Sequence, residues 1–229
     1  DQGIQGPKGD TCATTGIVIN VPSQQFATIQ QAIDSAALGD IINIAAGSYT
    51  EALKIKNKCL TIQGAGSGAT TISGVAGSDT INIDQSNGVI ISGVTVQGGA
   101  FGIRAVRGTA IEVSDTVVQN TASSGIRIDE NSTARLKNVT AQNTGLDGIA
   151  AFRSSSVTFS GTITTNNNNR DGMFIGGSSS SVFYEATVLA EGNKRHGIFI
   201  HTNGGLVAQK STITVKTNTS VGIMAFSSS

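Results

Sequence analysis

The sequence predicts an all-β protein, a right-handed parallel β-helix in which each turn of chain forms one coil of about 22–25 residues. A glycine followed by an aliphatic residue recurs from Gly102 to Gly222, at intervals of 23, 23, 24, 25 and 25 residues. Each interval contains short alternating apolar segments separated by polar turns, which is typical of strands. The 29 glycines, and the excess of Ser, Thr and Asn over Leu, Lys and Glu, also favour strands and tight turns over helices.

One helix is expected, before the repeats begin. Residues 26–37 place the apolar side chains Phe26, Ile29 and Ile33 on one face, and Gly39 ends the pattern. The open end of a solenoid must be covered to prevent edge-to-edge pairing with another chain. We therefore expect a short N-terminal capping helix.

Charge and hydropathy exclude several classes of protein. The chain has 15 basic and 15 acidic side chains, so it lacks the broad positive field of a nucleic-acid-binding protein. No apolar run approaches the roughly 18 residues of a membrane-spanning helix. We therefore expect neither nucleic acid nor membrane insertion among its interactions.

The first residues differ in composition from the rest. Gly3, Gly6 and Gly9 stand at every third position, which is the spacing that a collagen triple helix requires. The stretch at residues 7–10, Pro-Lys-Gly-Asp, resembles the ends of bacterial and phage collagen-like repeats. The pattern breaks at Cys12, where the next glycine is due. A flexible tail that matches this spacing by chance is the alternative.

We divide the chain accordingly into a collagen-like stub or linker at residues 1–11 and a β-helix at residues 12–229. Within the β-helix, the cap covers residues 17–40 and the coils cover residues 41–229, with an incomplete last coil. Three triplets are too short to fold alone, so we expect a longer stalk. A collagen-like stalk implies a homotrimer, located outside the cell or on a cell or virion surface.

An asparagine recurs near the end of each coil, 18 residues after the glycine in three coils and 21 residues after it in two. Stacked inside a β-helix, such side-chain amides hydrogen-bond to the turn backbone and to one another. We therefore predict a structural asparagine ladder. Its members are Asn120, Asn143, Asn166, Asn193 and Asn218.

The early part of the chain resembles the pectin-lyase-like β-helix superfamily. The resemblance lies in Phe-Ala-Thr-Ile-Gln-Gln-Ala-Ile at residues 26–33, Gly-Asp-Ile-Ile-Asn-Ile at 39–44, Gly-Ser-Tyr-Thr-Glu at 47–51 and Leu-Thr-Ile-Gln-Gly at 60–64. Pectin methylesterases and many carbohydrate-binding and sugar-hydrolase β-helix domains open in this way. The resemblance implies the fold and a bias towards polysaccharide ligands, but no reaction.

The catalytic motifs of the superfamily are missing from the chain. The Gln-Asp and Asp-Phe contexts of pectin methylesterases, the principal pectate lyase signatures and the Tyr-Gly-Phe-Asp-Pro-His motif of mannuronan epimerases are absent. The nearest match to the Gly-His-Gly of polygalacturonases is Arg195-His196-Gly197. These departures favour a non-catalytic protein.

One charged stack could still carry chemistry. Asp147, Asp171 and His196 each stand directly before the glycine of a coil, and Arg170 and Arg195 stand one position earlier. Two carboxylates on adjacent coils could share a proton or hold Ca²⁺, and the histidine could act as a base. The simpler interpretation is a polar turn in which Arg and Asp neutralise each other. No metal motif is recognised otherwise, and Ca²⁺ belongs only to the lyase alternative.

A stripe of apolar side chains is predicted on one outer face of the coils. In each Gly-Ile strand the first residue after the glycine points inward, so the second and fourth point outward. Apolar residues exposed in a row indicate a binding surface, and phenylalanine and methionine suit a contact between subunits. A slipped register or a covering loop is the alternative. The residues of this stripe are Phe152, Phe174, Phe199, Met224 and Phe226.

The two cysteines of the chain are Cys12 and Cys59. In an extracellular protein, such a pair is most simply a disulfide that ties the N-terminal segment to the first coils. A Cys12 bridge between chains at the stalk junction is the alternative.

These observations favour a non-catalytic extracellular β-helix that self-associates and binds a glycan or a host surface. The alternative is a polysaccharide lyase or hydrolase that acts on an acidic polysaccharide, with Asp147, Asp171, His196 and the two arginines at its site.

Overall fold

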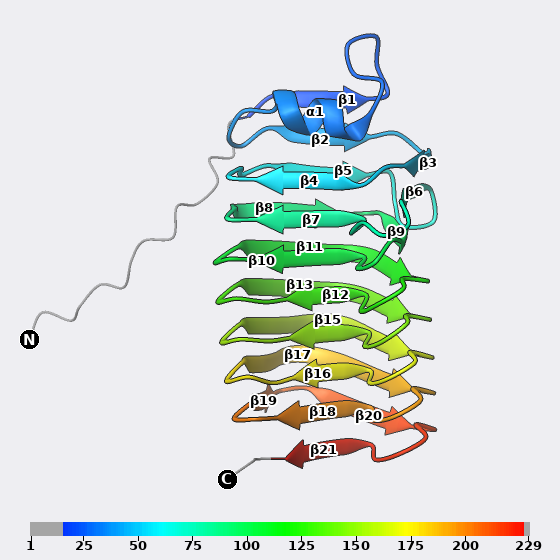
Figure 1. The fold of residues 1–229 in the computed structure, drawn as a ribbon, viewed down its shortest axis with the longest axis vertical. Coiled ribbons are helices and arrows are strands. Elements are labelled where there is room, and N and C mark those ends of the chain that lie inside the picture. The colour runs from blue at the N-terminus through cyan, green and yellow to red at the C-terminus, as the bar shows by residue number, and fades with distance from the viewer. Residues whose placement is uncertain (1–15, 227–229) are drawn as a thin grey trace, which may run out of the picture.

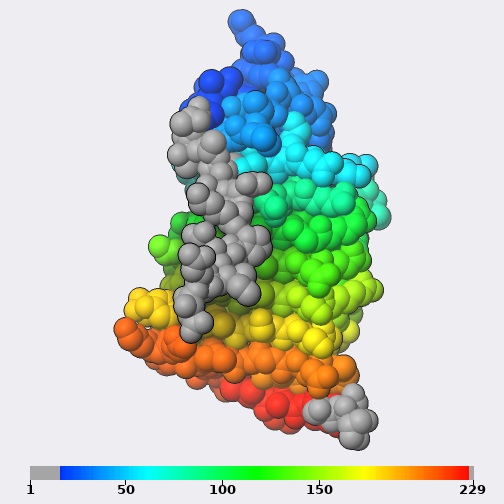
Figure 2. Space-filling view, turned by 90° about the vertical axis from the view of Figure 1, so that its left-hand side faces the viewer, coloured from blue at the N-terminus to red at the C-terminus, as the bar shows by residue number. Residues whose placement is uncertain are grey.

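The computed structural model describes residues 16–226, which form one elongated parallel β-solenoid with a helix at its N-terminal end (Figure 1). All strand pairs in this part of the chain are parallel, and the coils stack as layers along the long axis (Figure 2). Stacked parallel strands bury their inward side chains against those of the neighbouring coils, which explains the recurrence of apolar residues along the sequence.

Two sheets run along the solenoid. The eight-stranded sheet contains Leu53–Lys56 (β4), Ile81–Asp84 (β7), Ile103–Val106 (β10), Ile126–Ile128 (β12), Ile149–Ala151 (β14), Met173–Ile175 (β16), Ile198–His201 (β18) and Ile223–Phe226 (β21). The thirteen-stranded sheet contains Val18–Val21 (β1), Ile41–Ile44 (β2), Gly47–Thr50 (β3), Thr61–Gly64 (β5), Thr70–Gly74 (β6), Asn87–Ser92 (β8), Thr95–Gly98 (β9), Ala110–Gln119 (β11), Thr133–Gln142 (β13), Ser156–Asn166 (β15), Ser180–Glu191 (β17), Gly205–Gln209 (β19) and Thr212–Lys216 (β20).

The strand register follows the predicted repeat. Ile103 pairs with Ile126, Ile126 with Ile149, Ile149 with Met173 and Met173 with Ile198. All five side chains point inward and are at most 2% exposed, so they form an aliphatic column through the core. The intervals in the sequence therefore measure the length of each coil.

A glycine precedes each of these inward residues because two coils approach closely there. A Cβ atom added to Gly125 would lie 2.7 Å from the carbonyl oxygen of Gly148, and one added to Gly172 would lie 2.5 Å from that of Gly197. Real Cβ atoms essentially never approach backbone so closely, so a larger residue would push the coils apart. The recurring glycine is thus a requirement of coil stacking.

The capping helix α1 spans Ile29–Ser35 and covers the N-terminal end of the solenoid (Figure 1). It begins later than the pattern at residues 26–37 indicates, because Thr28 caps it in a capping box with Gln31. Its buried side chains include Ile29 and Ile33, as expected of the face that covers the core. The segment 17–40 also contributes a strand, since β1 pairs with β2.

The asparagine ladder is present in the C-terminal coils. Asn193 Nδ2 donates to Asn218 Oδ1 at 2.8 Å, and Asn168 Nδ2 donates to Asn193 Oδ1 at 2.9 Å. The same oxygens accept the backbone amides of Asn168 and Asn193 from the preceding coil. The ladder continues to Thr144, whose hydroxyl donates to Asn168 Oδ1 at 2.9 Å.

Three predicted members of the ladder lie elsewhere. Asn120 and Asn143 come one residue too early and are exposed, with φ angles of 55° and 54° in the left-handed region. Asn166 comes two residues too early and ends β15. Asparagine tolerates left-handed backbone better than most residues, so the turn selects it at this position as well as in the ladder.

A second polar ladder lies at the opposite turn and was not anticipated from the sequence. Its buried hydroxyl side chains accept backbone amides from the preceding coil, as in Thr109 to Ser132 at 3.2 Å and Ser155 to Ser179 at 3.1 Å. Both turns of the coil are therefore held by side chains that satisfy buried amides.

We expect Asn193→Ala to lower the free energy of unfolding by about 2–4 kcal/mol, because it leaves the buried amide of Asn168 and the carbonyl of Thr165 without partners. The measurement is the midpoint of urea unfolding. Asn169→Ala is the matched control, since Asn169 is exposed, and its effect should stay within about 0.5 kcal/mol. Equal effects of the two substitutions would contradict a structural role for the ladder.

Candidate functional site

The candidate site is a row of aromatic side chains on the outer surface of the eight-stranded sheet. The rings of Phe152 and Phe174 stack with centroids 4.6 Å apart, and Phe174 meets Phe199 edge-on at 5.6 Å. His201 lies 5.4 Å from Phe199 and stacks on Phe226 at 5.5 Å. We call these five rings, with Phe101 and the arginines described below, the aromatic face.

Register explains why the rings meet. Phe174 pairs with Phe199, which pairs with Met224, so these residues share one outward column. His201 pairs with Phe226 in a second outward column. Because successive coils are about 4.8 Å apart, large side chains in one column are forced into contact.

Arginine side chains lie over the rings. The guanidinium carbon of Arg127 is 4.3 Å from the centroid of Phe152 and 5.4 Å from that of Phe101. Arg170 lies over Phe174 at 5.5 Å, and Arg195 lies over Phe199 at 4.7 Å. Such cation–π contacts leave guanidinium edges and ring surfaces side by side. The face is therefore amphipathic along its length.

The predicted stripe and the aromatic face share Phe152, Phe174, Phe199 and Phe226, and Met224 of the stripe continues the column of Phe199; all five are at least partly exposed. Phe226 is the most open of them, with 50% of its surface exposed. Two other residues, at the second and fourth positions after a coil glycine, are buried. Ala150 is small and lies between Arg127 and Phe174 in its column, and Asp129 is covered by Arg127, whose Nη2 lies 2.8 Å from it.

Asp147 and Asp171 are fully buried beside the aromatic face, where arginines neutralise them. Arg170 makes a two-pronged ion pair with Asp147, with its Nε 2.7 Å from Oδ1. Arg195 binds Asp171 in the same way, with its Nε at 2.8 Å. Asp147 also accepts the backbone amide of Asp171, and Asp171 accepts that of His196. The carboxylate oxygens are thus already engaged by donors of the protein.

His196 stands in the next coil at the position that corresponds to Asp171, and it also accepts a backbone amide. It is 7% exposed, and its Nδ1 accepts the backbone amide of Val221 at 3.3 Å. Its ring lies 5.0 Å from that of Phe199, beneath the aromatic face. The structure thus brings together the five residues of the predicted charged stack as an interlocked turn that supports the rings above it.

Burial sets the electrostatics of this turn. Burial raises the pKa of Asp147 above its usual range, and the hydrogen bonds from Arg170 offset only part of this effect. The same hydrogen bonds raise the pKa of Arg170, and those that Arg195 donates to Asp171 raise the pKa of Arg195. Both arginines therefore stay charged near neutral pH.

No metal site accompanies these groups. Within residues 16–226, no three His, Cys, Asp or Glu side chains gather closely enough to hold a metal ion. Cys59 is disulfide-bonded, and Cys12, its expected partner, lies outside the described residues. The described part of the chain also contains no helix with the length and hydropathy to cross a membrane.

Phe101, and the placement of arginines over the rings, escaped the sequence-based prediction. A signal was present, because Arg170 precedes Phe174 by the same four residues by which Arg195 precedes Phe199. A repeat of this spacing in two successive coils indicates a repeated contact.

The fold and the site define a parallel β-solenoid with an outward aromatic and basic face. The chain belongs to the family described as right handed beta helix region, whose model matches residues 43–229. No curated protein matches the chain by sequence.

Solved structures share the fold at low sequence identity. An alginate lyase from a Paenibacillus species is 13% identical, with a TM-score of 0.58 over 91% of this chain and 99% of that chain. The A-module of a mannuronan C-5 epimerase from Azotobacter vinelandii is 18% identical, with a TM-score of 0.62 over 86% of this chain and 68% of that one. A pectin methylesterase from Aspergillus niger is 17% identical, with a TM-score of 0.56 over 97% and 89%. At these identities, the likeness concerns the fold alone.

We expect Arg170→Met to destabilise the protein by about 3–5 kcal/mol near neutral pH, since it leaves the buried carboxylate of Asp147 unpaired. The pKa of Asp147 is already raised in the folded protein, and losing the guanidinium raises it further. The folded variant therefore binds the proton more tightly than the unfolded chain does. Its stability should fall as pH rises above the ordinary aspartate pKa of about 4.

Urea unfolding between pH 4 and pH 8 measures this dependence. The double variant Asp147→Asn with Arg170→Met is the control, and it should recover most of the stability and lose the added pH dependence. Similar pH profiles for the single and double variants would show that Asp147 is not the titrating group.

Proposed function

We propose that the aromatic face binds a glycan and that the protein is a non-catalytic β-helix acting outside the cell. The main support for this proposal is that phenylalanine rings and guanidinium groups alternate on one open surface. Sugar rings present C–H groups on their faces and oxygen atoms at their edges. Aromatic rings suit the former, and the N–H groups of arginine suit the latter.

The shape of the aromatic face favours a glycan over a second subunit as its ligand. Phenylalanine and arginine are enriched at protein interfaces as well, so composition does not distinguish the two ligands. The face is a row of rings, and the guanidinium groups of Arg127, Arg170 and Arg195 lie over three of them. The face extends over five coil spacings, from Phe101 to Phe226, or about 24 Å. This length suits a short oligosaccharide that lies along the solenoid axis.

The charged turn supports the non-catalytic part of the proposal. A general acid or base needs an oxygen atom within hydrogen-bond reach of the substrate. Asp147 and Asp171 are 0% exposed, and arginine and backbone donors occupy their oxygens. A lyase or hydrolase centred on these residues would have to break both ion pairs before it could act.

The disulfide at Cys59 supports an oxidising compartment, as outside the cell. The glycines at every third position of residues 1–9 support a trimer on a collagen-like stalk, in a region outside the described residues. Three β-helices held together would bind a polymeric glycan with higher avidity than one β-helix.

Binding is tested with alginate and pectin, the polymers for which the structural neighbours are named, and with a neutral β-glucan. We expect retardation of the protein in at least one polysaccharide gel. Phe199→Ala and Phe152→Ala should each weaken binding about tenfold, which corresponds to ~1.4 kcal/mol per ring. Tyr184→Ala is the matched control, because Tyr184 is 45% exposed but belongs to the other sheet.

Unchanged retardation in both phenylalanine variants, or an equal loss in Tyr184→Ala, would place the glycan elsewhere. Weaker retardation at high salt would indicate that the arginines meet carboxylate groups of the polymer, since salt screens such contacts.

We expect no turnover of these polymers. The measurement is the ultraviolet absorbance of unsaturated product ends, together with reducing ends, with and without added Ca²⁺. Activity that disappears in Asp171→Asn would overturn the non-catalytic proposal and establish the lyase or hydrolase alternative.

A further inference from the structure

The corner where the chain enters the solenoid carries the most exposed large apolar side chains among the described residues. Ile17 is 68% exposed, Leu38 is 67% exposed and Val18 is 55% exposed. Val18 lies on the outward side of β1, which is the first strand of the thirteen-stranded sheet. We call these three residues the entry corner.

Backbone contacts hold the corner together. Asp40 accepts the amide of Ile17 at 2.9 Å and that of Ala37 at 2.8 Å, which joins the start of β1 to the turn that carries Leu38. Gly16 lies against this turn so closely that an added Cβ would lie 2.1 Å from the carbonyl oxygen of Gly39. The exposed side chains therefore project from backbone that hydrogen bonds and close packing hold in place.

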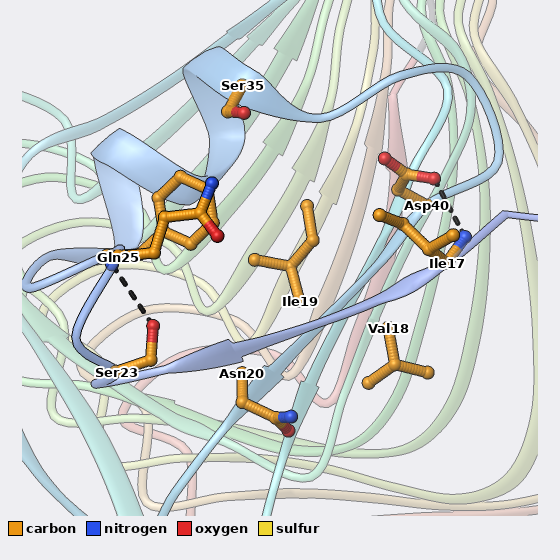
Figure 3. Close-up of a pocket in the computed structure, with 9 residues that line it drawn as sticks. Ile17, Val18, Ile19, Asn20, Ser23, Gln25, Ser35 and Asp40 are labelled. Carbon is orange, nitrogen blue, oxygen red and sulfur yellow. Dashed lines mark hydrogen bonds between the residues drawn. The ribbon is translucent and has the colours of Figure 1, made fainter.

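A hollow lies beside the corner, between β1 and the helix α1 (Figure 3). It has a volume of about 310 Å³. Its lining residues include Ile17, Ile19 and Phe26, with Ser35 on the helix and Ser23 just after β1. Figure 3 shows Ile17 and Ile19 on the helix-facing side of β1. The hollow thus combines an apolar floor with a polar rim.

We infer that the entry corner is the interface between copies of this chain, with Leu38 of one copy seated in the hollow of the next. This inference rests on the trimer of the proposed function. A collagen triple helix holds three chains at a common axis, and the seven residues from Asp10 to Gly16 span at most about 25 Å. The parts of the three β-helices that directly follow Gly16 would therefore lie nearest the common axis and nearest one another.

The pairing of a projection with a hollow suits this symmetry. A three-fold ring is closed by heterologous contacts, in which one surface of each copy meets a different surface of its neighbour. Leu38 and the hollow are two such surfaces on one chain. Among the described residues, β1 begins its sheet and pairs only with β2, so a neighbouring chain can approach its other edge.

This placement leaves the aromatic face free. That face runs along the eight-stranded sheet from β10 to β21, whereas the entry corner lies at β1 and α1 (Figure 1). Self-association therefore belongs to the entry corner, in place of the phenylalanine stripe expected to mediate it.

The test measures the mass of the full chain by light scattering, coupled to size-exclusion chromatography. We expect the wild type to have three times the 23.3 kDa of one chain. Leu38→Asp and Val18→Asp should each reduce the mass threefold, because each buries a charge in the interface. Val75→Asp is the matched control, since Val75 is also exposed, at 47%, but lies after β6. It should keep the mass of the wild type.

A second measurement tests the interface without relying on the mass. Hydrogen exchange of the β1 amides should slow in the wild type relative to Leu38→Asp, while the amides of β12 and β14 exchange equally in both. A trimer that persists in Leu38→Asp and Val18→Asp would overturn the entry-corner interface and leave the trimer in place. A monomeric wild type would overturn both the trimer and the interface.

Discussion

The register of parallel hydrogen bonds between coils is the constraint on which the rest of this structure depends. It places every residue about 4.8 Å from its counterparts in the coils on either side, whatever their chemistry. Inward positions therefore form aliphatic columns, and outward positions form columns of rings and guanidinium groups. The contact between Phe174 and Phe199 needs no dedicated loop, because it follows from their pairing in β16 and β18.

The same constraint accounts for the polar residues in the turns. Each turn presents a backbone amide to a neighbouring coil, and an unpaired buried amide in that position is costly. Asp147, Asp171 and His196 are chemically different, yet each accepts the amide of the coil that follows. A histidine stacked on two aspartates resembles a catalytic cluster in the sequence. The shared hydrogen bond shows that all three side chains also hold the turn, a task that either carboxylate or imidazole can perform.

The sequence predicts those features that one coil shares with the next. Coil length, strand starts and the inward column follow from the spacing of glycines, because those glycines mark close approaches of backbone, as at Gly125. The ladder position is less evident, since asparagine suits both the ladder and the left-handed residue before it. Counting back four residues from the next glycine leads from Gly172 to Asn168 and from Gly197 to Asn193. Features that occur once, such as the hollow beside Phe26, have no repeat from which to be predicted.

The two contacts proposed for this solenoid, with a glycan and with other copies of the chain, run in different directions. A ligand on the aromatic face would extend along the axis, across β12, β14 and β16, while copies that met at β1 would be joined at one end only. Neither contact excludes the other, because they use different surfaces and different directions. Copies joined at the entry corner would hold their aromatic faces at a fixed spacing, so a long polymer bound to one face would remain within reach of the others. The gain in affinity would then come from geometry, with each face contributing only the modest attraction of a few rings.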